Sequence, residues 1–568
     1  MIDRRTLLKG LAATAALPVL TGCSRRSADD AVGGDEDLGD TILYHLRTPR
    51  SIDPFDADAA GLAVVSQLFD PLMRYDAATD ELACQAAESV DVRENATSFT
   101  FHLRSGLTFS NGDAVDAASF KRAWERLVDP DSPAARSSDA SPWAYLLTLV
   151  EGYDALATGT ADGLAGVACP DVSTLRVALT RPYADFPLLC AHPALSPVPA
   201  SALDDAEAFH AQPIGNGAFS LADAWDGKSM LALERVDGYA DPSRTGAVPE
   251  SDGESGAVAA EPVASVRFVF DDDSSSAYKR LETGDLDVAT VPVEQLESAE
   301  DAFGSRTQGI ALAGGGHLLS TREPTVVYLT CNMTEPPFDN ADVRRALSLA
   351  IDREALCDKV YLGACEPATS AVAPCIATDG GDSWPYAAYD PDRAKQLLEL
   401  HYPAAEDGSR ELEIAVCYSK DGADAKLVDA LATDFKAVGV SVKDEVLEWD
   451  ELVSRFRTGD FMCGVTSWTP DALSLDSALY PLFRSGVAAA GNYARYADTE
   501  VDASLDEARA IVDATARRQA LSRVLRIVGE ASPIIPLVVP VRTVATSDRV
   551  VSLAIDPYGR PYLAAATF

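Results

Sequence analysis

The feature that most constrains the fold of this chain is an alternation of strand-like and helix-like patterns from Glu411 to Asp471. The stretch "LEIAVCYS" is typical of a strand, and "AKLVDALATDFKAVG" places Leu427, Leu431 and Phe435 four residues apart, as one face of a helix requires. The strand-like "VSVKDEVL", the helix-like "WDELVSRFRTG" and the strand-like "DFMCGVTSW" follow in that order. Because parallel strands need a crossover connection, this β-α-β-α-β order predicts a parallel sheet covered by helices.

A ligand site is expected where the third of these strands ends. In open sheets of this kind, ligands bind in the crevice beyond the carboxyl ends of the strands. Trp468 closes the strand, and Asp471 follows three residues later, directly after Pro470. The alternative is that Asp471 only stabilises a turn, since proline followed by aspartate is common in turns.

The first 23 residues have the layout of a secretory signal. Arg4 and Arg5 precede an apolar run from Leu11 to Leu20, which is shorter than the roughly 20 residues needed to span a bilayer. The arginine pair, followed by leucines, resembles a twin-arginine signal. Residues 1–23 are therefore expected to direct export.

The end of this signal resembles the lipobox of bacterial lipoproteins. Leu20, Thr21 and Gly22 precede Cys23, and in that motif the cysteine is lipidated and becomes the first mature residue. We expect Cys23 to anchor the protein to the extracytoplasmic face of the cell membrane, with residues 24–40 as a polar tether. The alternative is an ordinary cleaved signal with a chance cysteine.

The composition predicts a chain of more than one lobe. With 568 residues, of which 47% are apolar, it can bury large cores. Its net charge of −41 is spread along the sequence, which argues against nucleic acid as a partner, because phosphate backbones favour basic surfaces. Residues 241–262 are rich in glycine, proline, serine and acidic residues and predict a surface insertion.

The cysteines and histidines do not form a recognisable catalytic or metal site. Ten cysteines less Cys23 leave nine, so at least one is expected to remain a free thiol. Cys357, Cys365 and Cys375 lie close in sequence, and one disulfide among them is compatible with their spacing, whereas a zinc site is not. The sequence also lacks the motifs of serine hydrolases, zinc proteases and phosphate-binding loops. We expect no catalysis, no metal and no cofactor.

Several stretches, in order along the chain, resemble one protein family. They include "FTFHLRSGLTFSNGDAVDAASFKRAWERLVDP" (99–130), "IGNGAFSLADAW" (214–225) and "PPFDNADVRRALSLAIDREAL" (336–356). Together these blocks resemble the extracytoplasmic peptide-binding proteins of ABC importers, the oligopeptide- and dipeptide-binding family (solute-binding protein family 5). The resemblance implies an α/β fold, the large two-lobed periplasmic-binding-protein fold of type II, with an extra domain on the first lobe.

The resemblance also implies how the chain divides into domains. The expected boundaries are 41–72, 200–325 and 541–568 for lobe I, 73–199 for the extra domain II, and 326–540 for lobe III. The chain would cross between lobes I and III near Thr325 and Val541, and Pro324 and Pro540 flank these crossings. Two connecting strands of this kind would form a hinge, and the protein is expected to be a monomer.

In that family, the aspartate of a Trp-x-x-Asp segment accepts the free α-amine of a bound peptide, and Trp468 to Asp471 match that segment. A carboxylate can compensate a desolvated ammonium through a charge-assisted hydrogen bond. The resemblance adds five candidates, which are Trp449, Thr469 and Tyr328 in lobe III and Trp143 and Tyr145 in the extra domain. Tyr328 is expected to flank the ligand from a connecting strand. For Trp449, packing in the core beneath its own helix is an equal alternative.

Three departures from the family pattern bear on the ligand. Val465 stands where oligopeptide binders have an arginine, Thr330 replaces a glutamate, and 538–540 replace a run of tyrosines. These changes predict a pocket that is less polar and less aromatic than the oligopeptide type. No residue for the peptide carboxylate is identified.

The function implied is that of a lipid-anchored solute-binding protein. It would capture peptides in a cleft between lobes by hinge closure and deliver them to an ABC permease and its ATPase subunits. One alternative is a non-peptide solute of the same family, such as a nickel complex, haem or an oligosaccharide. Another is a peptide-sensing receptor or chaperone without a transport role.

Overall fold

The structure is a computed structural model, and it describes residues 39–76, 81–135, 141–239, 262–312, 316–377, 384–420, 424–487 and 491–568. The expected signal with Cys23, nearly all of the expected tether and the expected insertion at 241–262, except for its last residue, lie outside these residues. Asp40 to Phe568 form one compact unit. In the part of the chain that the structure describes, no helix is long and apolar enough to cross a membrane.

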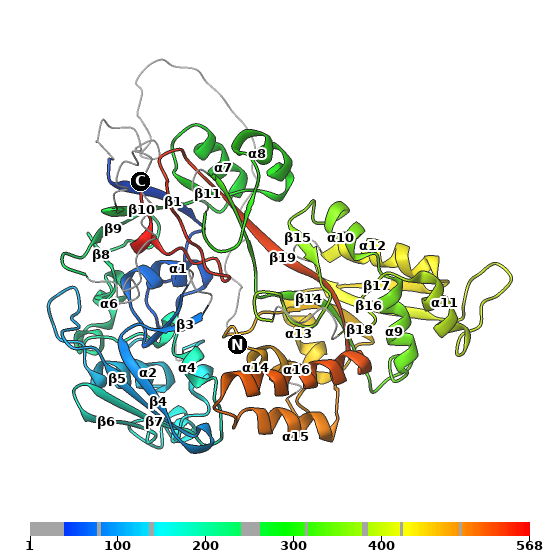
Figure 1. Cartoon of the computed structure of the whole chain (residues 1–568), viewed down its shortest axis with the longest axis horizontal. Helices are drawn as coiled ribbons and strands as arrows, with labels where there is room; N and C mark the ends of the chain where they lie inside the picture. Colours follow the sequence, from blue (N-terminus) through cyan, green and yellow to red (C-terminus); the bar gives the residue numbers. More distant parts are fainter. Residues whose placement is uncertain are drawn as a thin grey trace, which may run out of the picture. The chain divides into compact units, whose positions relative to one another are not determined.

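One large sheet runs through this unit (Figure 1). Its strands in the described residues are β1 (Thr41–Leu46), β8 (Phe219–Leu221), β9 (Leu231–Arg235), β10 (Ser265–Phe270), β11 (Val288–Thr290), β12 (Thr307–Gln308), β13 (Leu318–Arg322), β14 (Val326–Cys331), β15 (Cys365–Pro367), β16 (Glu413–Ser419), β17 (Ser441–Leu447), β18 (Cys463–Trp468) and β19 (Ile534–Thr546). The main order is β17-β16-β18-β14-β19-β11-β1-β10-β9-β8. Strands β13 and β15 pair with β19, and β12 pairs with β13.

The long strand β19 joins the two halves of this sheet. Its first half pairs with β14 and β15, for example Val538 with Val327 and Pro367. Its second half pairs with β13 and β11, for example Arg542 with Thr321. All four pairings are antiparallel, so one strand carries hydrogen-bonded ladders in both halves of the sheet.

The predicted β-α-β-α-β unit is present. Strand β16 is parallel to both β17 and β18, and the connections are α12 (Asp424–Ala437) and α13 (Trp449–Thr458). Leu427, Leu431 and Phe435 of α12 are fully buried, as their spacing predicted. The carboxyl ends of the three strands therefore lie at one edge of the sheet.

Two smaller sheets belong to the N-terminal third of the chain. They contain β2 (Met73–Asp76) with β3 (Glu81–Cys84), and β4 (Ala87–Val92), β5 (Ser98–Leu103), β6 (Val167–Asp171) and β7 (Thr174–Ala178) in the order β4-β5-β7-β6. Helix α2 (Ala117–Val128) packs on β6 and β7. It begins with a capping box between Asp116 and Ser119, which satisfies backbone donors of its first turn.

The other helices pack around these sheets and form separate cores (Figure 1). They are α1 (Ala59–Leu68), α3 (Tyr153–Ala157), α4 (Phe186–Leu189), α5 (Ser201–Asp204), α6 (Ala206–Ala211), α7 (Ser274–Glu282), α8 (Leu296–Phe303), α9 (Ala341–Ala350), α10 (Arg353–Lys359), α11 (Pro391–Glu399), α14 (Leu475–Phe483), α15 (Thr499–Ala508) and α16 (Ala514–Ala531). Side chains of α9 and α12 share one core with β16 and β18. Helices α14, α15 and α16 enclose another, which includes Tyr328 and borders Trp468.

The segment "IGNGAF" is explained by close backbone packing. A Cβ added at Gly215 would overlap the carbonyl oxygen of Leu68, the last residue of α1. Asn216 accepts a hydrogen bond from the Asp70 amide (2.9 Å) and donates one to the Asp70 carbonyl (3.0 Å). This motif therefore fixes one loop against the end of α1, and its role in the fold is structural.

A buried ion cluster stabilises the N-terminal part of the unit. Arg126 of α2 donates to both carboxylate oxygens of Asp53 (2.7 and 2.6 Å), and His210 Nδ1 of α6 lies 2.7 Å from the same carboxylate. All three side chains are buried. Burial alone would raise the pKa of Asp53, but Arg126 and His210 outweigh it and hold that pKa well below its usual range.

Candidate ligand site

The carboxyl edge of β16, β17 and β18 gathers several of the predicted site residues. Ser419 at the end of β16 pairs with Leu447 at the end of β17, and Trp449 follows two residues later. Trp468 ends β18 on the other side of β16. Since neighbouring strands are separated by about 4.8 Å, β17 and β18 run about 10 Å apart on the two sides of β16.

Asp471, in the turn between β18 and α14, contacts a tyrosine from a distant part of the sequence. The hydroxyl of Tyr145, in the 3₁₀ helix Ala144–Leu147, donates a hydrogen bond to Asp471 Oδ1 at 2.6 Å. In the described part of the chain, no hydrogen bond reaches the second oxygen, Oδ2. Burial raises the pKa of Asp471, and the bond from Tyr145 lowers it in part. This carboxylate keeps one oxygen available to an incoming donor.

The turn itself does not depend on the Asp471 carboxylate. Ser474 is the N-cap of α14 and accepts a hydrogen bond from the Ser477 amide (3.1 Å), and the Ser477 hydroxyl accepts one from the Ala472 amide (3.3 Å). Among the described residues, no backbone amide donates to Asp471. The interpretation of Asp471 as a turn-stabilising residue is therefore disfavoured.

A C-terminal turn brings Tyr558 to the same place. The Tyr558 hydroxyl donates to the carbonyl oxygen of Pro470 at 3.0 Å, and its ring lies under the guanidinium of Arg560, 4.7 Å from the ring centroid. Burial, opposed by Arg560, raises the pKa of Tyr558, and the nearby carboxylates of Asp556 and Asp471 contribute. Sequence reasoning missed Tyr558, because nothing in its local pattern links it to Pro470, 88 positions earlier.

Thr469 links the site to a connecting segment. Its hydroxyl lies 2.7 Å from the hydroxyl of Thr325, the residue directly before β14. Thr325 is where the sequence predicted a crossing between lobes. Thr469 is exposed, so the candidate site and the start of β14 meet at an accessible surface.

Trp468 and Tyr328 lie on the inner side of this edge. Trp468 is half-buried and donates from Nε1 to the carbonyl of Ser477 (3.2 Å), packing against the core of α14 to α16. Tyr328 is only 1% exposed, because its face of β14 is covered by that core. The expectation that Tyr328 flanks a ligand does not fit this structure, in which its side chain is not accessible.

Trp449 is 48% exposed. The core beneath α13 is made by other side chains, among them Leu452 and Phe456. The alternative that Trp449 is a core residue is therefore wrong. Its position at the start of α13, beside the carboxyl edge of the sheet, leaves its ring available for contact with another molecule.

The ring of Trp143 packs beside that of Tyr145. Its indole Nε1 donates to the carbonyl of Ala57 (3.0 Å), and its ring centroid lies 6.5 Å from that of Tyr145 and 4.6 Å from that of His192. Burial lowers the pKa of His192 to about 3, so this imidazole is neutral at pH 7. Tyr145 itself is 44% exposed, so it is the ring of this group that faces solvent.

The departures from the family pattern lie away from this surface. Thr330, Val465, Val538 and Val539 are all buried in β14, β18 and β19. Their side chains fill the cores that pack on the sheet. These four residues do not line an accessible surface in this structure, whereas Pro540 of β19 is half-buried. The expectation of a less polar and less aromatic pocket therefore stays a prediction.

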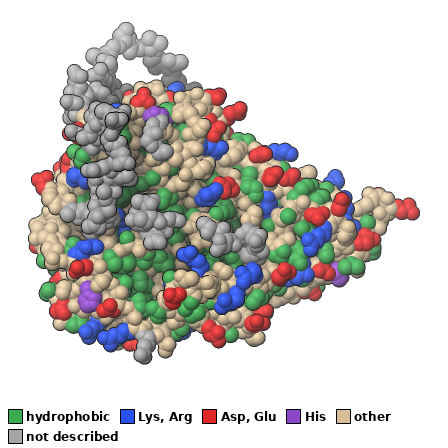
Figure 2. All heavy atoms as spheres, in the orientation of Figure 1, with side chains coloured by type: hydrophobic (Ala, Val, Ile, Leu, Met, Phe, Trp, Pro, Cys, Tyr) green, Lys and Arg blue, Asp and Glu red, His purple; other side chains and the backbone are tan. Residues whose placement is uncertain are grey.

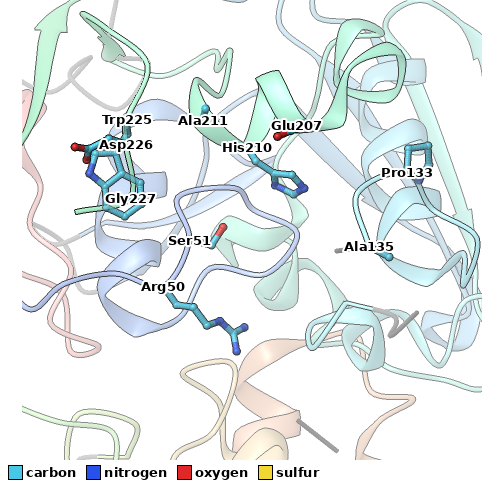
Figure 3. A pocket seen from close by; sticks show the side chains of 10 residues that line it. All are labelled: Arg50, Ser51, Pro133, Ala135, Glu207, His210, Ala211, Trp225, Asp226 and Gly227. Atoms are coloured by element: carbon cyan, nitrogen blue, oxygen red, sulfur yellow. The ribbon is translucent and has the colours of Figure 1, made fainter. Parts of the chain in front are cut away.

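A separate cavity of about 530 Å³ lies in another part of the unit (Figure 3). Its lining residues are Arg50, Ser51, Pro133, Ala135, Glu207, His210, Ala211, Trp225, Asp226 and Gly227. Two of its charged side chains already form hydrogen bonds within the protein. Arg50 donates to the Asp56 carbonyl (2.9 Å), and Asp226 accepts from Ser229. None of the predicted site residues lines it. The chemistry of the Asp471 carboxylate therefore makes the carboxyl edge the better candidate.

Comparison with known proteins identifies a family. A family model described as "Bacterial extracellular solute-binding proteins, family 5 Middle" matches residues 81–490. The chain is 28% identical over 501 residues to a probable deoxycholate-binding periplasmic protein of Escherichia coli K12, covering 86% of each. It is 25% identical over 535 residues to an oligopeptide-binding protein of Bacillus subtilis, covering 91% of each.

Solved structures agree in fold. The unliganded open form of the periplasmic murein tripeptide-binding protein MppA superposes with a TM-score of 0.77 at 23% identity, covering 93% of this chain and 97% of that one. The oligopeptide-binding protein of Haemophilus influenzae in complex with the peptide RPPGFSPFR gives a TM-score of 0.64 at 26% identity, covering 93% and 99%. The α/β fold expected from the sequence is thus confirmed over more than nine-tenths of the chain.

Proposed function

This chain belongs to the bacterial extracellular solute-binding proteins of family 5, and we propose that the solute it captures for an ABC transporter is a short peptide whose free amine pairs with Asp471. Proteins of this family bind solutes and perform no catalysis. The observation that carries the proposal is the Asp471 carboxylate, which has one oxygen held by Tyr145 and the other without a hydrogen bond from the described residues.

The chemistry of this carboxylate suits an ammonium group. An amine brought into a cleft loses part of its hydration, and an ionised carboxylate compensates that loss through a charge-assisted hydrogen bond. Tyr145 orients the carboxylate without neutralising it, because partial burial and the adjacent Asp471 carboxylate raise the pKa of Tyr145 and keep its proton in place. The site therefore favours a cationic group at Oδ2.

Around this point, exposed side chains supply surface for the rest of the ligand. We assign contact roles to Tyr145, Thr469 and Trp449, with Trp468, Trp143 and Tyr558 as supports of the surface. Closure of the lobes around the ligand would bury it and present the closed form to the permease. Anchoring through a lipid on Cys23 is part of the proposal and would hold the protein at the extracytoplasmic face of the membrane.

The proposal is tested by thermal unfolding of the mature protein, lacking residues 1–23, with a pool of short peptides and the same pool N-acetylated. Protein freed of bound solute by unfolding and refolding is used. A ligand at about 100 times its dissociation constant adds roughly 2.7 kcal/mol to stability. We expect the free-amine pool to raise the melting temperature and the acetylated pool to leave it unchanged.

Two variants separate the contribution of the Asp471 charge from that of the Tyr145 hydroxyl. Asp471→Asn removes the negative charge at constant size and is expected to abolish the shift, since loss of one partner of a desolvated ion pair typically costs about 3–5 kcal/mol. Tyr145→Phe removes only the hydroxyl and should weaken the shift without abolishing it. If the acetylated pool stabilises the unaltered protein as much as the free-amine pool does, the amine is not recognised.

A second candidate is a bulky apolar solute. The ring of Tyr145, whose hydroxyl contacts Asp471, is 44% exposed, and the ring of Trp449 at the start of α13 is 48% exposed. Exposed aromatic rings of this kind stack on flat or fused-ring molecules. One relative is named as a probable deoxycholate-binding protein and another as haem-binding. Stabilisation by deoxycholate or haem, retained in Asp471→Asn and lost in Trp449→Ala, would favour this candidate over peptides.

A further inference from the structure

We propose that Cys357 and Cys365 form an intrachain disulfide that fixes the loop between α10 and β15 against the connecting strand β19. Their Sγ atoms lie 2.8 Å apart, and both are free thiols in this structure. Both side chains are buried. A disulfide has an S–S distance of about 2.04 Å, so the two sulfurs need to approach by less than about 1 Å to form the bond.

The backbone already holds the two cysteines in register. The Gly363 amide donates to the Cys357 carbonyl (3.0 Å), which turns the chain back directly after α10. Cys365 begins β15 and pairs with Pro540 of β19, and the Val541 amide donates to the Ala364 carbonyl (2.9 Å). The positions of both Cβ atoms are therefore set by a helix and a ladder, and the bond can form by movement of side chains alone.

The loop enclosed by the two cysteines lies where β19 changes partners. Arg306, between α8 and β12, donates from Nη1 to the carbonyl of Gly363 (3.2 Å). Just beyond the loop, Arg322 at the end of β13 forms an ion pair with Glu366 (2.8 Å). This segment thus contacts both halves of the large sheet, and a covalent link between its ends would hold it there.

The bond forms by thiol–disulfide exchange. The thiolate of one cysteine attacks the S–S bond of an oxidant, which we take to be a protein or small-molecule disulfide, and forms a mixed disulfide with release of one thiol. The second cysteine then displaces the remaining half of the oxidant. Two electrons pass to the oxidant, which leaves as two thiols, and the protein gains one S–S bond.

The presence of this bond in the cell rests on the proposed export of the protein, because disulfides persist in oxidising compartments outside the cytoplasm. The tendency of the pair to oxidise is a property of the fold and is tested separately. Cys331 and Cys463 offer a matched control, since they are buried partners across β14 and β18. Cys375, which is only partly buried, is the competing partner.

The first experiment refolds the reduced protein in equal concentrations of reduced and oxidised glutathione. Free thiols are then blocked in denaturant, and cross-linked peptides are mapped by mass spectrometry. We expect Cys357 linked to Cys365 in the unaltered chain, and the same link in Cys375→Ser and in Cys331→Ser. Full alkylation of Cys357 once the protein is unfolded in denaturant would overturn the proposal. So would a link to Cys375 that disappears in Cys375→Ser.

The second experiment compares thermal unfolding of the oxidised protein with and without a reductant. Reduction should lower the melting temperature of the unaltered chain and of Cys331→Ser by the same amount. It should have no effect on the Cys357→Ser/Cys365→Ser double variant. A reductant-dependent shift that survives in the double variant would assign the effect to other cysteines. Peptide mapping of the unaltered chain decides the question even if the double variant does not fold.

Discussion

At Asp471, burial and hydrogen bonding act on one carboxyl group in opposite directions. Burial raises the pKa of Asp471, and the hydroxyl of Tyr145 offsets part of that rise. A ligand ammonium at the free oxygen would add a positive charge and lower the pKa again. Binding therefore favours the ionised form, and the affinity of the site depends on pH.

We expect the affinity for a free-amine peptide to be constant near neutral pH and to fall as the pH drops through the raised pKa of Asp471. Below that pKa, each pH unit weakens binding by about tenfold, or 1.36 kcal/mol. Titration calorimetry from pH 7 downward measures this, since the peptide amine stays protonated there. Asp471→Asn should bind weakly at every pH. A pH-independent affinity in the unaltered chain would contradict a role for the ionised carboxylate.

The buried cluster of Asp53, Arg126 and His210 predicts a strong effect of charge removal on stability. Arg126→Met leaves the Asp53 carboxylate buried without its bidentate partner, and we expect a loss of about 3–5 kcal/mol in the free energy of unfolding. Chemical denaturation measures this. The exposed pair Asp91 and His102 is the control, because substitution of either residue should cost less than about 1 kcal/mol.

The same cluster predicts that the folded protein loses stability in acid. The folded-state pKa of Asp53 is held below its unfolded value of about 3.9. Its stabilising contribution is therefore complete only above about pH 5 and is lost progressively as the pH falls through about 3.9 toward the lowered folded-state pKa. Arg126→Met should show a smaller loss of stability between pH 5 and 3 than the unaltered chain, whose unfolding is followed at each pH.

At the scale of helices and strands, the sequence predicted most where its patterns are local. The parallel order of β16, β17 and β18 follows from apolar spacing and crossover length. The ligand role of Asp471, argued from its place after β18, stays a prediction. Contacts that join distant segments left no such pattern. Tyr145 meets Asp471 across 326 positions, and Tyr558 reaches Pro470 from a C-terminal turn. Burial of Tyr328 depends on how α14 to α16 cover β14, which periodicity along β14 alone cannot predict.

The packing of "IGNGAF" on the end of α1 gives a prediction for a single element. Gly215→Ala places a methyl group on the Leu68 carbonyl oxygen, and a backbone atom cannot rotate away as a side chain can. We expect a loss of about 1–3 kcal/mol or more in the free energy of unfolding. Gly112→Ala is the control, because its Cβ meets no atom within 4 Å and only the positive φ of 87° opposes it, at about 1–2 kcal/mol. A smaller loss in Gly215→Ala than in Gly112→Ala would refute this account.

At the scale of the whole unit, two ion pairs join segments far apart in sequence. Arg517 of α16 pairs with Asp185 (2.7 Å), and Arg509, directly after α15, pairs with Asp476 of α14 (2.7 Å) while its carbonyl accepts the Ala184 amide (2.8 Å). These contacts connect the loop before α4 with the α14–α16 layer. Elsewhere the acidic side chains are dispersed over the visible face (Figure 2), where solvent screens them.

Arg517→Met should therefore destabilise the unit as a whole. It leaves Asp185, a buried carboxylate, without its ion partner, and we expect a loss of about 3–5 kcal/mol in the free energy of unfolding. Arg518→Met, at the exposed neighbouring position, should change stability by less than about 0.5 kcal/mol. Denaturant unfolding followed by tryptophan fluorescence and by circular dichroism measures both. Similar midpoints for the two variants would mean that the contact contributes little.

Strand β19 has a mechanical consequence for any motion of the two halves of the sheet. Because β19 pairs with strands of both halves, a rotation of one half against the other would have its axis near the point where β19 changes partners. Atoms near Val541 would then move little, while displacement grows with distance from that axis. A pair of spectroscopic labels with one on the outer helix α11 and one on α7 would report such a rotation, whereas labels beside Val541 would report almost none.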